Sequence, residues 1–244
     1  MASTQSIADN FDRFFRVEIA NKPQLLDKVQ YVRYRVYCEE FGFEAVEDCP
    51  GEREKDIYDL QSTHCLITHL PSGDPAGCVR MVPTLAEQPD SLLPFEKFCG
   101  SSLDSELLDE LALDRTTICE ISRLAVDRNF RRRSGEHQTR FGSPTHLGFS
   151  EEEKRTLPFI AVSAYLAATA LTERSGRTNV FAMMEPFLPR LLNRAGIRFT
   201  RVGQDIDYHG LRAPYFIKTQ SALEGMSQEL KDLFTAIEGQ LFPN

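Results

Sequence analysis

The sequence predicts a single α/β (α+β) domain with a central mixed, twisted sheet and helices on both of its faces. The 244 residues have the length of one large domain or two small ones, and no linker or internal repeat divides them. Apolar residues make up 41% and charged residues 26%, which is typical of a globular protein. Hairpin-like strands come first and alternating strands and helices follow, which favours one sheet covered by helices. We therefore expect residues 1–244 to form one domain.

Four features are predicted in the first half of the chain. They are a strand, a helix, a hairpin and a short helix, over residues 14–20, 22–41, 62–70 with 77–84, and 103–112. The first helix has one apolar face, because its apolar residues are spaced four, three and four positions apart: Leu25, Val29, Val32 and Val36. Gly42 is a suitable residue to end this helix.

The second half alternates strands and helices. We expect strands over 118–126, 177–183, 197–202 and 213–219, and helices over 157–172, 186–195 and 221–238. Thr156 is the candidate N-cap of helix 157–172, and Gly196 ends helix 186–195. Residues 127–153 form a polar and basic loop that exceeds the usual length, so it is either functional or mobile. Residues 203–244 add a C-terminal strand and helix.

The net charge of −8 is unevenly distributed. Residues 39–59 hold nine acidic side chains against two basic ones, and residues 127–140 hold five arginines against two acidic ones. Nucleic acid is a poor fit for such a chain. The arginines suit either a small acidic protein or a phosphate group, and a solvated loop is the alternative. They are Arg128, Arg131, Arg132, Arg133 and Arg140.

Targeting and metal-binding signals are not visible. The N-terminus lacks the basic and apolar regions of a signal peptide, and no stretch reaches the roughly 20 apolar residues of a membrane span, so a cytoplasmic protein is expected. The six cysteines form no CxxC pair and the five histidines no HxxxH pair, so no metal site is expected. The cysteines are expected to be reduced.

A first group of candidate site residues joins the helix over 22–41 to the loop that follows. Arg33 falls at the edge of the apolar face, and Tyr37 lies one turn later. A half-buried arginine requires carboxylate partners, which Glu54, Asp56 and Asp59 can supply. The alternative is that these acids only solvate a loop. Arg80 interrupts an apolar strand, so it lies either on the solvent face or in a site.

The strand ICEISRLAV gives the sharpest inference. Regular alternation would place Glu120 and Arg123 on opposite faces of the sheet. A β-bulge between them would bring both side chains to one face and leave a backbone N–H near Ser122–Leu124 without a strand partner. Such an N–H can stabilise a developing oxyanion. The alternative is a regular strand with Arg123 extended along the opposite face.

Four segments in the order YVRYRVYCEEFGFE, EKDIYD, GCVRMVPT and CEISRLAV resemble the acyl-homoserine-lactone (autoinducer) synthases and the N-acyl amino acid synthases. They span residues 31–126. LLNRAGIRFTRVG resembles the last helix and strand of the Gcn5-related N-acetyltransferase (GNAT) fold, to which this family belongs. DYHGLRAPYFI resembles acyltransferases of the bacterial exosortase/PEP-CTERM sorting system. The resemblance implies a GNAT-like acyl-CoA N-acyltransferase fold with a bulged central strand.

The resemblance also implies roles for the candidate residues. Glu54, Glu120 and Arg123 would be catalytic, with Glu54 or Glu120 as the base. The substrate-binding residues would be Arg33, Tyr37, Phe43, Asp56, Asp59, Arg80, Ser122 and Leu124. Two residues depart from the family pattern: Tyr37 replaces a Phe, and Phe43 replaces the usual Trp. The second change favours an amino acid or small amine over S-adenosylmethionine as the acceptor.

The expected reaction is transfer of a long-chain acyl group from acyl carrier protein to that amine. The thioester is a co-substrate and no cofactor is expected. The arginines of 128–140 would dock the acidic carrier protein, and the lipid product implies contact with a membrane surface. Three alternatives stay open: an acyl-homoserine-lactone synthase that uses S-adenosylmethionine, a non-catalytic acyl-binding or scaffold protein of the sorting system, and an acetyltransferase that uses acetyl-CoA.

Overall fold

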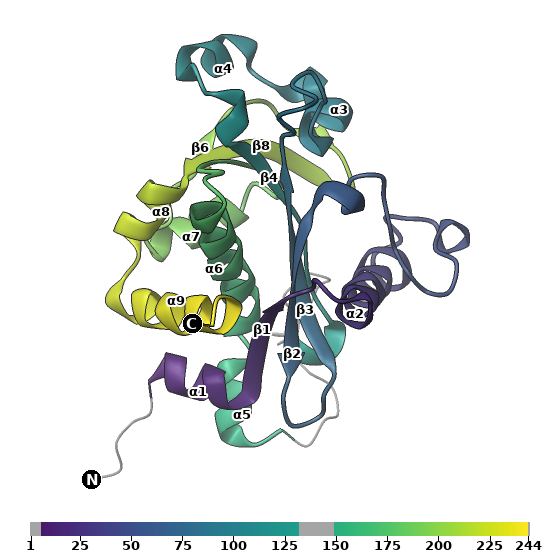
Figure 1. The fold of residues 1–244 in the computed structure, drawn as a ribbon, viewed down its shortest axis with the longest axis vertical. Coiled ribbons are helices and arrows are strands. Elements are labelled where there is room, and N and C mark those ends of the chain that lie inside the picture. The colour runs from purple at the N-terminus through teal and green to yellow at the C-terminus, as the bar shows by residue number, and fades with distance from the viewer. Residues whose placement is uncertain (1–5, 132–148, 244) are drawn as a thin grey trace.

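Strands from all parts of the chain meet in one open sheet in the computed structural model, which describes residues 6–131 and 149–243 (Figure 1). The strand order is β1-β2-β3-β4-β5-β8-β6, and β7 pairs with β8. The strands are β1 (Phe15–Ile19), β2 (Thr63–His69), β3 (Pro75–Pro83), β4 (Ile118–Val126), β5 (Asn179–Met184), β6 (Thr200–Arg201), β7 (Ile206–Asp207) and β8 (Leu211–Lys218). The predicted strand 118–126 is confirmed at both ends.

Nine α-helices are formed by the described residues. They are α1 (Ile7–Phe14), α2 (Pro23–Arg33), α3 (Pro94–Cys99), α4 (Ser105–Leu111), α5 (Glu151–Thr156), α6 (Phe159–Arg174), α7 (Leu188–Arg194), α8 (Thr219–Gly225) and α9 (Gln228–Leu241). The C-terminal part of the predicted helix 22–41 is wider than an α-helix, because Tyr34–Glu40 form a π-helix directly after α2. π-helical turns are rare and are found often at functional sites.

Helices cover both faces of the sheet, as predicted. α2 packs on one face, and α6 and α9 lie on the other (Figure 1). The alternation along β2 shows why: Cys65 and Ile67 join the core beneath α6, whereas Leu66 joins the core beneath α2. Both faces of the central strands are therefore apolar.

The sheet is mixed because one of its strand pairs is parallel. β4 and β5 pair in parallel, and every other pair is antiparallel. The parallel register extends only from Ile118 to Glu120 on β4 and from Asn179 to Phe181 on β5. Beyond Glu120 the edge of β4 that faces β5 has no strand partner among residues 6–131 and 149–243, and a cleft lies between the two strands there.

The predicted start of the long apolar helix is wrong. Thr156 is the last residue of α5 rather than the cap of α6. Ser150 caps α5 through a capping box with Glu153, so the end of the predicted loop 127–153 is helical. α6 begins after Pro158, whose φ of −60° suits a helix start and whose nitrogen has no hydrogen to leave unpaired.

The C-terminal predictions are partly wrong as well. The predicted helix 221–238 is two helices, because Met226 and Ser227 have extended backbones between α8 and α9. The predicted strand 197–202 pairs only over Thr200–Arg201. Helices α1 and α3 were not predicted, since each is shorter than the windows in which a helical repeat is visible.

No helix among residues 6–131 and 149–243 is long and apolar enough to cross a membrane.

A close backbone approach predicts a large cost for one glycine substitution. Gly196 has φ of +88°, and a Cβ there would lie 1.7 Å from the Gly225 carbonyl oxygen. Gly176 has φ of +70° with open space around it, so it serves as the matched control. We expect Gly176→Ala to lower the free energy of unfolding by about 1–2 kcal/mol and Gly196→Ala to lower it by more than about 3 kcal/mol. Urea denaturation measures both, and equal losses would contradict the contact.

Candidate functional site

A β-bulge in β4 brings the two predicted catalytic side chains to one face of the sheet. β3 pairs Cys78 with Ala125 but Arg80 with Ser122, so β4 contains one residue more than its partner. Arg123 lies in this bulge with φ of +51°. The predicted bulge is therefore confirmed, but it consists of Arg123 and Leu124 rather than of residues between Glu120 and Arg123.

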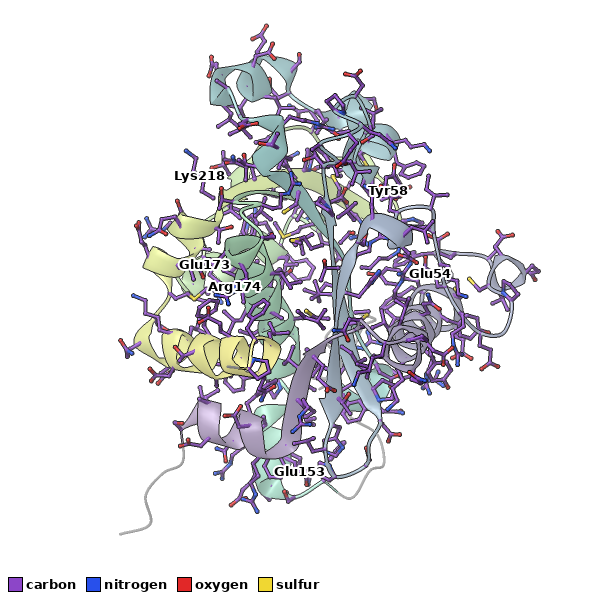
Figure 2. All side chains as sticks on the ribbon, in the orientation of Figure 1. Glu54, Tyr58, Glu153, Glu173, Arg174 and Lys218 are labelled. Atoms are coloured by element: carbon purple, nitrogen blue, oxygen red, sulfur yellow. The ribbon has the colours of Figure 1, made fainter. Side chains whose placement is uncertain are left out.

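The core contacts show the change of face independently. Cys119 and Ile121 pack in the core beneath α6, before the bulge. After the bulge, Val126 packs there instead, and Ala125 packs beneath α2. The bulge therefore reverses the face on which odd-numbered side chains of β4 lie. Arg123 lies on the α2 side of the sheet, the same side as Glu120. Glu54 and Tyr58 lie on this side of the sheet too (Figure 2).

Glu120 and Arg123 line one cavity of about 490 Å³. Its walls come from the π-helix and the loop after it, α3, the bulge of β4 and the turn before β8. The lining residues are Tyr37, Glu44, Asp56, Ile57, Tyr58, Arg80, Pro94, Lys97, Phe98, Glu120, Ile121, Ser122, Arg123, Met183, Tyr208, His209 and Arg212. This volume is in the range of sites that hold small molecules.

An ion-pair network joins α2 to the loop that follows the π-helix. Arg33 is completely buried and donates through Nε to Glu54 and through Nη1 to Asp59 at 2.7 Å. Arg80 donates through Nη1 to Asp56 at 2.6 Å and to Asp59 at 2.8 Å. Burial makes these charges costly unless each one is paired. The acids therefore do more than solvate a loop, and Arg80 is not on a solvent face.

Arg123 extends the network to the bulge. Its Nη2 lies 3.1 Å from Glu54 Oε1, 3.2 Å from Glu44 Oε1 and 3.4 Å from Asp56 Oδ2. Glu54 is thus held between the guanidinium groups of Arg33 and Arg123. Burial alone would raise the pKa of Glu54, but the two positive charges outweigh burial and lower it.

Glu120 has the opposite electrostatic environment. Its side chain is 4% exposed, and one carboxylate oxygen accepts the Phe95 N–H at 2.8 Å. Burial raises the pKa of Glu120 to about 7, and the more distant positive charges of Arg80 and Arg123 offset this only in part. A carboxyl group with a pKa near neutrality is suited to accept and release a proton. Of the two predicted bases, only Glu120 has a raised pKa, because Glu54 lies between two guanidinium groups that lower its pKa.

The two aromatic residues that depart from the family pattern both contact the site. Tyr37 donates its hydroxyl hydrogen to the Leu124 carbonyl at 3.1 Å, and Arg123 lies over its ring at 5.3 Å. A phenylalanine could not make that hydrogen bond. The Phe43 ring stacks on Phe41 at 5.3 Å. Tyr37 therefore fixes one carbonyl of the bulge.

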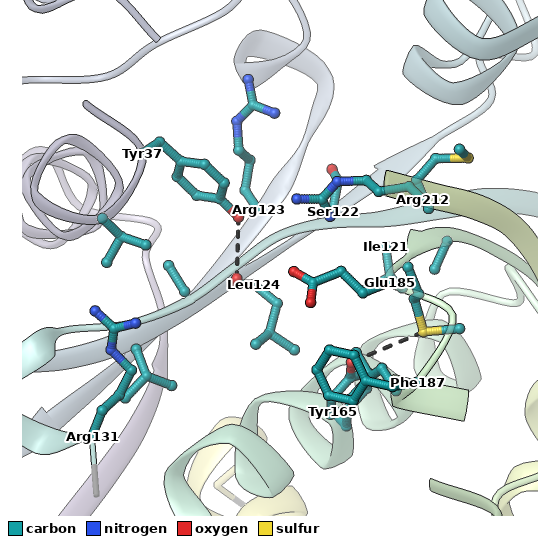
Figure 3. Close-up of a pocket in the computed structure, with 17 residues that line it drawn as sticks. Tyr37, Ile121, Ser122, Arg123, Leu124, Arg131, Tyr165, Glu185, Phe187 and Arg212 are labelled. Atoms are coloured by element: carbon teal, nitrogen blue, oxygen red, sulfur yellow. Dashed lines mark hydrogen bonds between the residues drawn. The ribbon is translucent and has the colours of Figure 1, made fainter. Parts of the chain in front are cut away.

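A second space adjoins the cavity where β4 and β5 separate. This cleft is lined by Ile121–Val126 of β4, by the end of β5 and the turn after it, by the π-helix, and by single side chains of α6 and β8 (Figure 3). Tyr37, Ser122, Arg123 and Arg212 line both the cleft and the cavity. The bulge is therefore the wall at which the two spaces meet.

The cleft continues toward an apolar pocket beneath the sheet. Ile121 and Ala182 line both, together with Tyr165 of α6. Deeper walls come from α6, β5, β8, α8 and the segment between α7 and β6, and include Ala168, Val180, Ile197, Phe199 and Ile217. Such an apolar surface suits an alkyl group. The pocket has a volume of about 40 Å³, which holds a short alkyl segment, so a longer chain would also have to occupy the cleft or widen the pocket.

The predicted docking arginines differ from one another. Arg128 is exposed, as a docking residue must be. Arg131 is wrong as a docking residue, because it is buried, pairs with Glu40 and lies 5.3 Å over the Phe41 ring. Arg132, Arg133 and Arg140 lie outside the described residues.

Sequence reasoning missed eleven of the seventeen residues that line the cavity, including three at the start of β8 or just before it. Tyr208, His209 and Arg212 belong to the turn between β7 and β8 and to the start of β8. Burial raises the pKa of Tyr208 to about 12, so its hydroxyl is protonated at neutral pH. The segment DYHGLR was noted only because it resembles a known family. No pattern within the segment indicates that it folds back over the bulge.

The described residues hold no cluster of three or more His, Cys, Asp or Glu side chains that could bind a metal ion. The prediction that no metal is used rests on the sequence alone.

Comparisons with known proteins agree with this architecture. Residues 32–139 match the family described as Acetyltransferase (GNAT) domain. No curated protein sequence matches the chain. The solved structure of the AHL synthase LasI superposes with a TM-score of 0.56 at 23% identity, covering 87% of this chain and 95% of LasI. The chain has the GNAT acyltransferase fold.

Two further structures share this fold. The CoA-dependent acyl-homoserine lactone synthase BjaI, solved with SAM and isopentyl-CoA, gives a TM-score of 0.58 at 17% identity, covering 94% of this chain and 91% of BjaI. FeeM, an N-acyl amino acid synthase from uncultured soil microbes, gives 0.54 at 11% identity, covering 87% and 94%. At these identities the likeness is one of fold. The prediction of an acyltransferase enzyme agrees with the matched domain family.

The ion-pair network predicts very different costs for two aspartate substitutions. Asp59→Asn removes a charge shared by buried Arg33 and Arg80, so we expect the free energy of unfolding to fall by about 3–5 kcal/mol. Asp27 makes a two-pronged but exposed pair with Arg53, so Asp27→Asn is the matched control and costs at most about 1 kcal/mol. Similar losses in urea denaturation would argue against a stabilising network.

Proposed function

We propose that the chain is an N-acyltransferase that moves a long-chain acyl group from a thioester to the amine of an amino acid or another small amine. One observation carries the proposal: the bulge of β4 separates a polar cavity, which contains a carboxyl group of near-neutral pKa, from a cleft that continues into an apolar pocket. A polar amine and a long-chain thioester require these two kinds of space side by side.

The proposed reaction is a direct displacement. The acceptor enters as an ammonium ion, and the Glu120 carboxylate, directly or through a water molecule, accepts one of its protons. The neutral amine then attacks the thioester carbonyl carbon, and the C–N bond forms while the C–S bond breaks. The nitrogen gives up its second proton as the amide forms, and the departing thiolate takes a proton and leaves as the thiol. Glu120 then returns the first proton to solvent, and no covalent intermediate forms on the protein.

The bulge is the proposed site of oxyanion stabilisation. Arg123 and Leu124 lie opposite a single residue of β3, so the regular ladder of hydrogen bonds is interrupted there. The Tyr37 hydroxyl donates a hydrogen bond to the Leu124 carbonyl, which fixes the orientation of the peptide group that follows Leu124. Backbone N–H groups near Ser122–Leu124 are then available to the carbonyl oxygen of the donor. Arg123 acts in the same place, because its guanidinium fixes the bulge through Glu54.

Acyl carrier protein is the proposed donor, with acyl-CoA as the alternative. Carrier proteins are acidic, and exposed Arg128, Lys154 and Arg155 flank the segment that precedes α6. BjaI is described as CoA-dependent, so the fold is compatible with an acyl-CoA donor. A membrane contact through the lipid product remains part of the proposal.

Three other functions are distinguished by their products. A homoserine-lactone synthase would consume S-adenosylmethionine, and Phe43 in place of the family's Trp argues against it. A scaffold protein of a bacterial sorting system would release no thiol. An acetyltransferase would prefer acetyl-CoA, which leaves the apolar pocket unused. The link to such a sorting system rests on sequence resemblance alone.

The assignment of Glu120 predicts a specific pH dependence. Since the deprotonated carboxylate is the base, kcat/KM in a thiol-release assay should rise with pH through about 7. Glu120→Gln keeps an oxygen that can accept the Phe95 N–H, and we expect it to lower kcat by about 10²-fold or more. Mass spectrometry identifies the acylated amine. Full activity of Glu120→Gln, or a rate that is flat down to pH 5, would contradict the assignment.

The pH dependence of stability is a control that Glu120→Gln remains folded. The raised pKa of Glu120 means that the folded state favours the protonated form, so its contribution is complete below the ordinary carboxyl pKa and is lost as pH rises through about 7. Glu120→Gln does not titrate. We therefore expect the variant to stay folded and to lose less stability than the parent protein between pH 5 and pH 8.

A further inference from the structure

Arg212 is a buried arginine in an unusual environment. Its side chain lies at the start of β8, and the residue is 8% exposed. Nε donates to the Tyr208 carbonyl at 2.7 Å and Nη2 to the His209 carbonyl at 3.1 Å. The guanidinium plane is therefore fixed by the turn that it closes, while Nη1 has no hydrogen-bond partner among the described residues.

The other buried arginines of the described chain all have carboxylate partners. Arg33 pairs with Glu54 and Asp59, and Arg80 pairs with Asp56 and Asp59. Buried Arg131 pairs with Glu40. Arg212 forms no salt bridge with any described carboxylate, and two carbonyl dipoles are its only hydrogen-bond acceptors there. An uncompensated buried cation is costly, so its retention points to an anionic ligand.

The position of Arg212 identifies where that anion would bind. Arg212 lines both the polar cavity and the cleft, and its guanidinium lies 6.0 Å from the centre of the Phe43 ring. Glu120 lines the same cavity. A ligand between these two groups meets a proton acceptor at one end and a fixed, planar guanidinium at the other. Planar guanidinium groups match the geometry of carboxylates.

We propose that Arg212 binds the carboxylate of the acceptor, which is therefore an amino acid rather than a simple amine. This inference rests on the proposed function. The ammonium group faces Glu120, and the carboxylate faces Arg212. The cavity of about 490 Å³ leaves room for a large side chain, and Ile57, Tyr58 and Phe98 offer it an apolar wall.

Lys97 is the competing cation in the cavity. It is exposed, and its ammonium group lies 5.4 Å from the centre of the Phe98 ring. Water compensates an exposed ammonium, so Lys97 has no need of an anionic ligand. Because Lys97 and Arg212 line the same cavity and have the same charge, a pair of variants separates their roles.

The first experiment measures binding and requires no turnover. N-dodecanoyl-phenylalanine and N-dodecanoyl-phenethylamine differ only in the carboxylate, and calorimetry gives the affinity of the protein for each. We expect the parent protein to prefer the acid by about 10- to 100-fold, the effect of a charged hydrogen bond. Arg212→Gln should reduce the preference to near unity, and Lys97→Gln should keep it. If the parent protein binds the acid and the amine derivative with equal affinity, this result alone overturns the proposal, and no variant is needed.

The variants give further outcomes. A preference that survives in Arg212→Gln and disappears in Lys97→Gln assigns the carboxylate to Lys97 and overturns the proposal. If Arg212→Gln does not fold, Arg212→Lys keeps the charge but loses the planar fork. The proposal expects its preference to fall at least threefold, and an unchanged preference contradicts it.

The second experiment separates this inference from the proposed function. Thiol release from a dodecanoyl thioester is measured with phenylalanine and with phenethylamine as acceptors. Release with phenylalanine alone supports both. Equal release with the two acceptors supports the acyltransferase and overturns the role of Arg212. Absence of release with either acceptor, together with carboxylate-dependent binding, argues against the acyltransferase and leaves Arg212 as a carboxylate-binding residue.

Discussion

The structure of the site depends on one buried carboxylate held between two guanidinium groups. Glu54 pairs with Arg33 on α2 and with Arg123 in the bulge of β4, so a single side chain ties the helix on one face of the sheet to the central strand. Arg123 has a left-handed backbone that a residue with a Cβ adopts only at a cost. The ion pairs offset this cost, because without the bulge Arg123 would lie on the opposite face and Glu54 would keep only one partner.

Two consequences follow from this distortion. Glu120 and Arg123 reach the same cavity, and the edge of β4 beyond Glu120 leaves β5, so the cleft opens beside that cavity. The charges around the site also give two glutamates, which are not distinguishable in the sequence, different pKa values. Glu54 lies beside two cations and stays ionised, whereas Glu120 is buried beside a backbone N–H and has a raised pKa. Environment rather than residue type selects the base.

Most strands of the sheet and several residues of the site could be predicted from the sequence. The strand 118–126 was predicted from its local pattern. Its bulge was not fixed by that pattern, because a regular strand was equally compatible with Glu120 and Arg123, and the family resemblance was what implied the bulge. Thr156 failed as a cap because Ser150 makes a better capping box six residues earlier. Arg131 failed as a docking residue because its burial depends on Glu40, which is distant in the chain. Arg212 was missed for the same reason, since tertiary folding alone brings β8 to the bulge.

The most direct test is a crystal structure with a donor analogue that cannot transfer its acyl group, such as an S-(2-oxotetradecyl) pantetheine. The account predicts that the alkyl chain fills the apolar pocket beside α6, and that the ketone oxygen lies about 3 Å from a backbone N–H within residues 122–124. The open side of the carbonyl would face the cavity of Glu120. An alkyl chain bound outside the cleft, or a ketone oxygen remote from the bulge, would contradict the account.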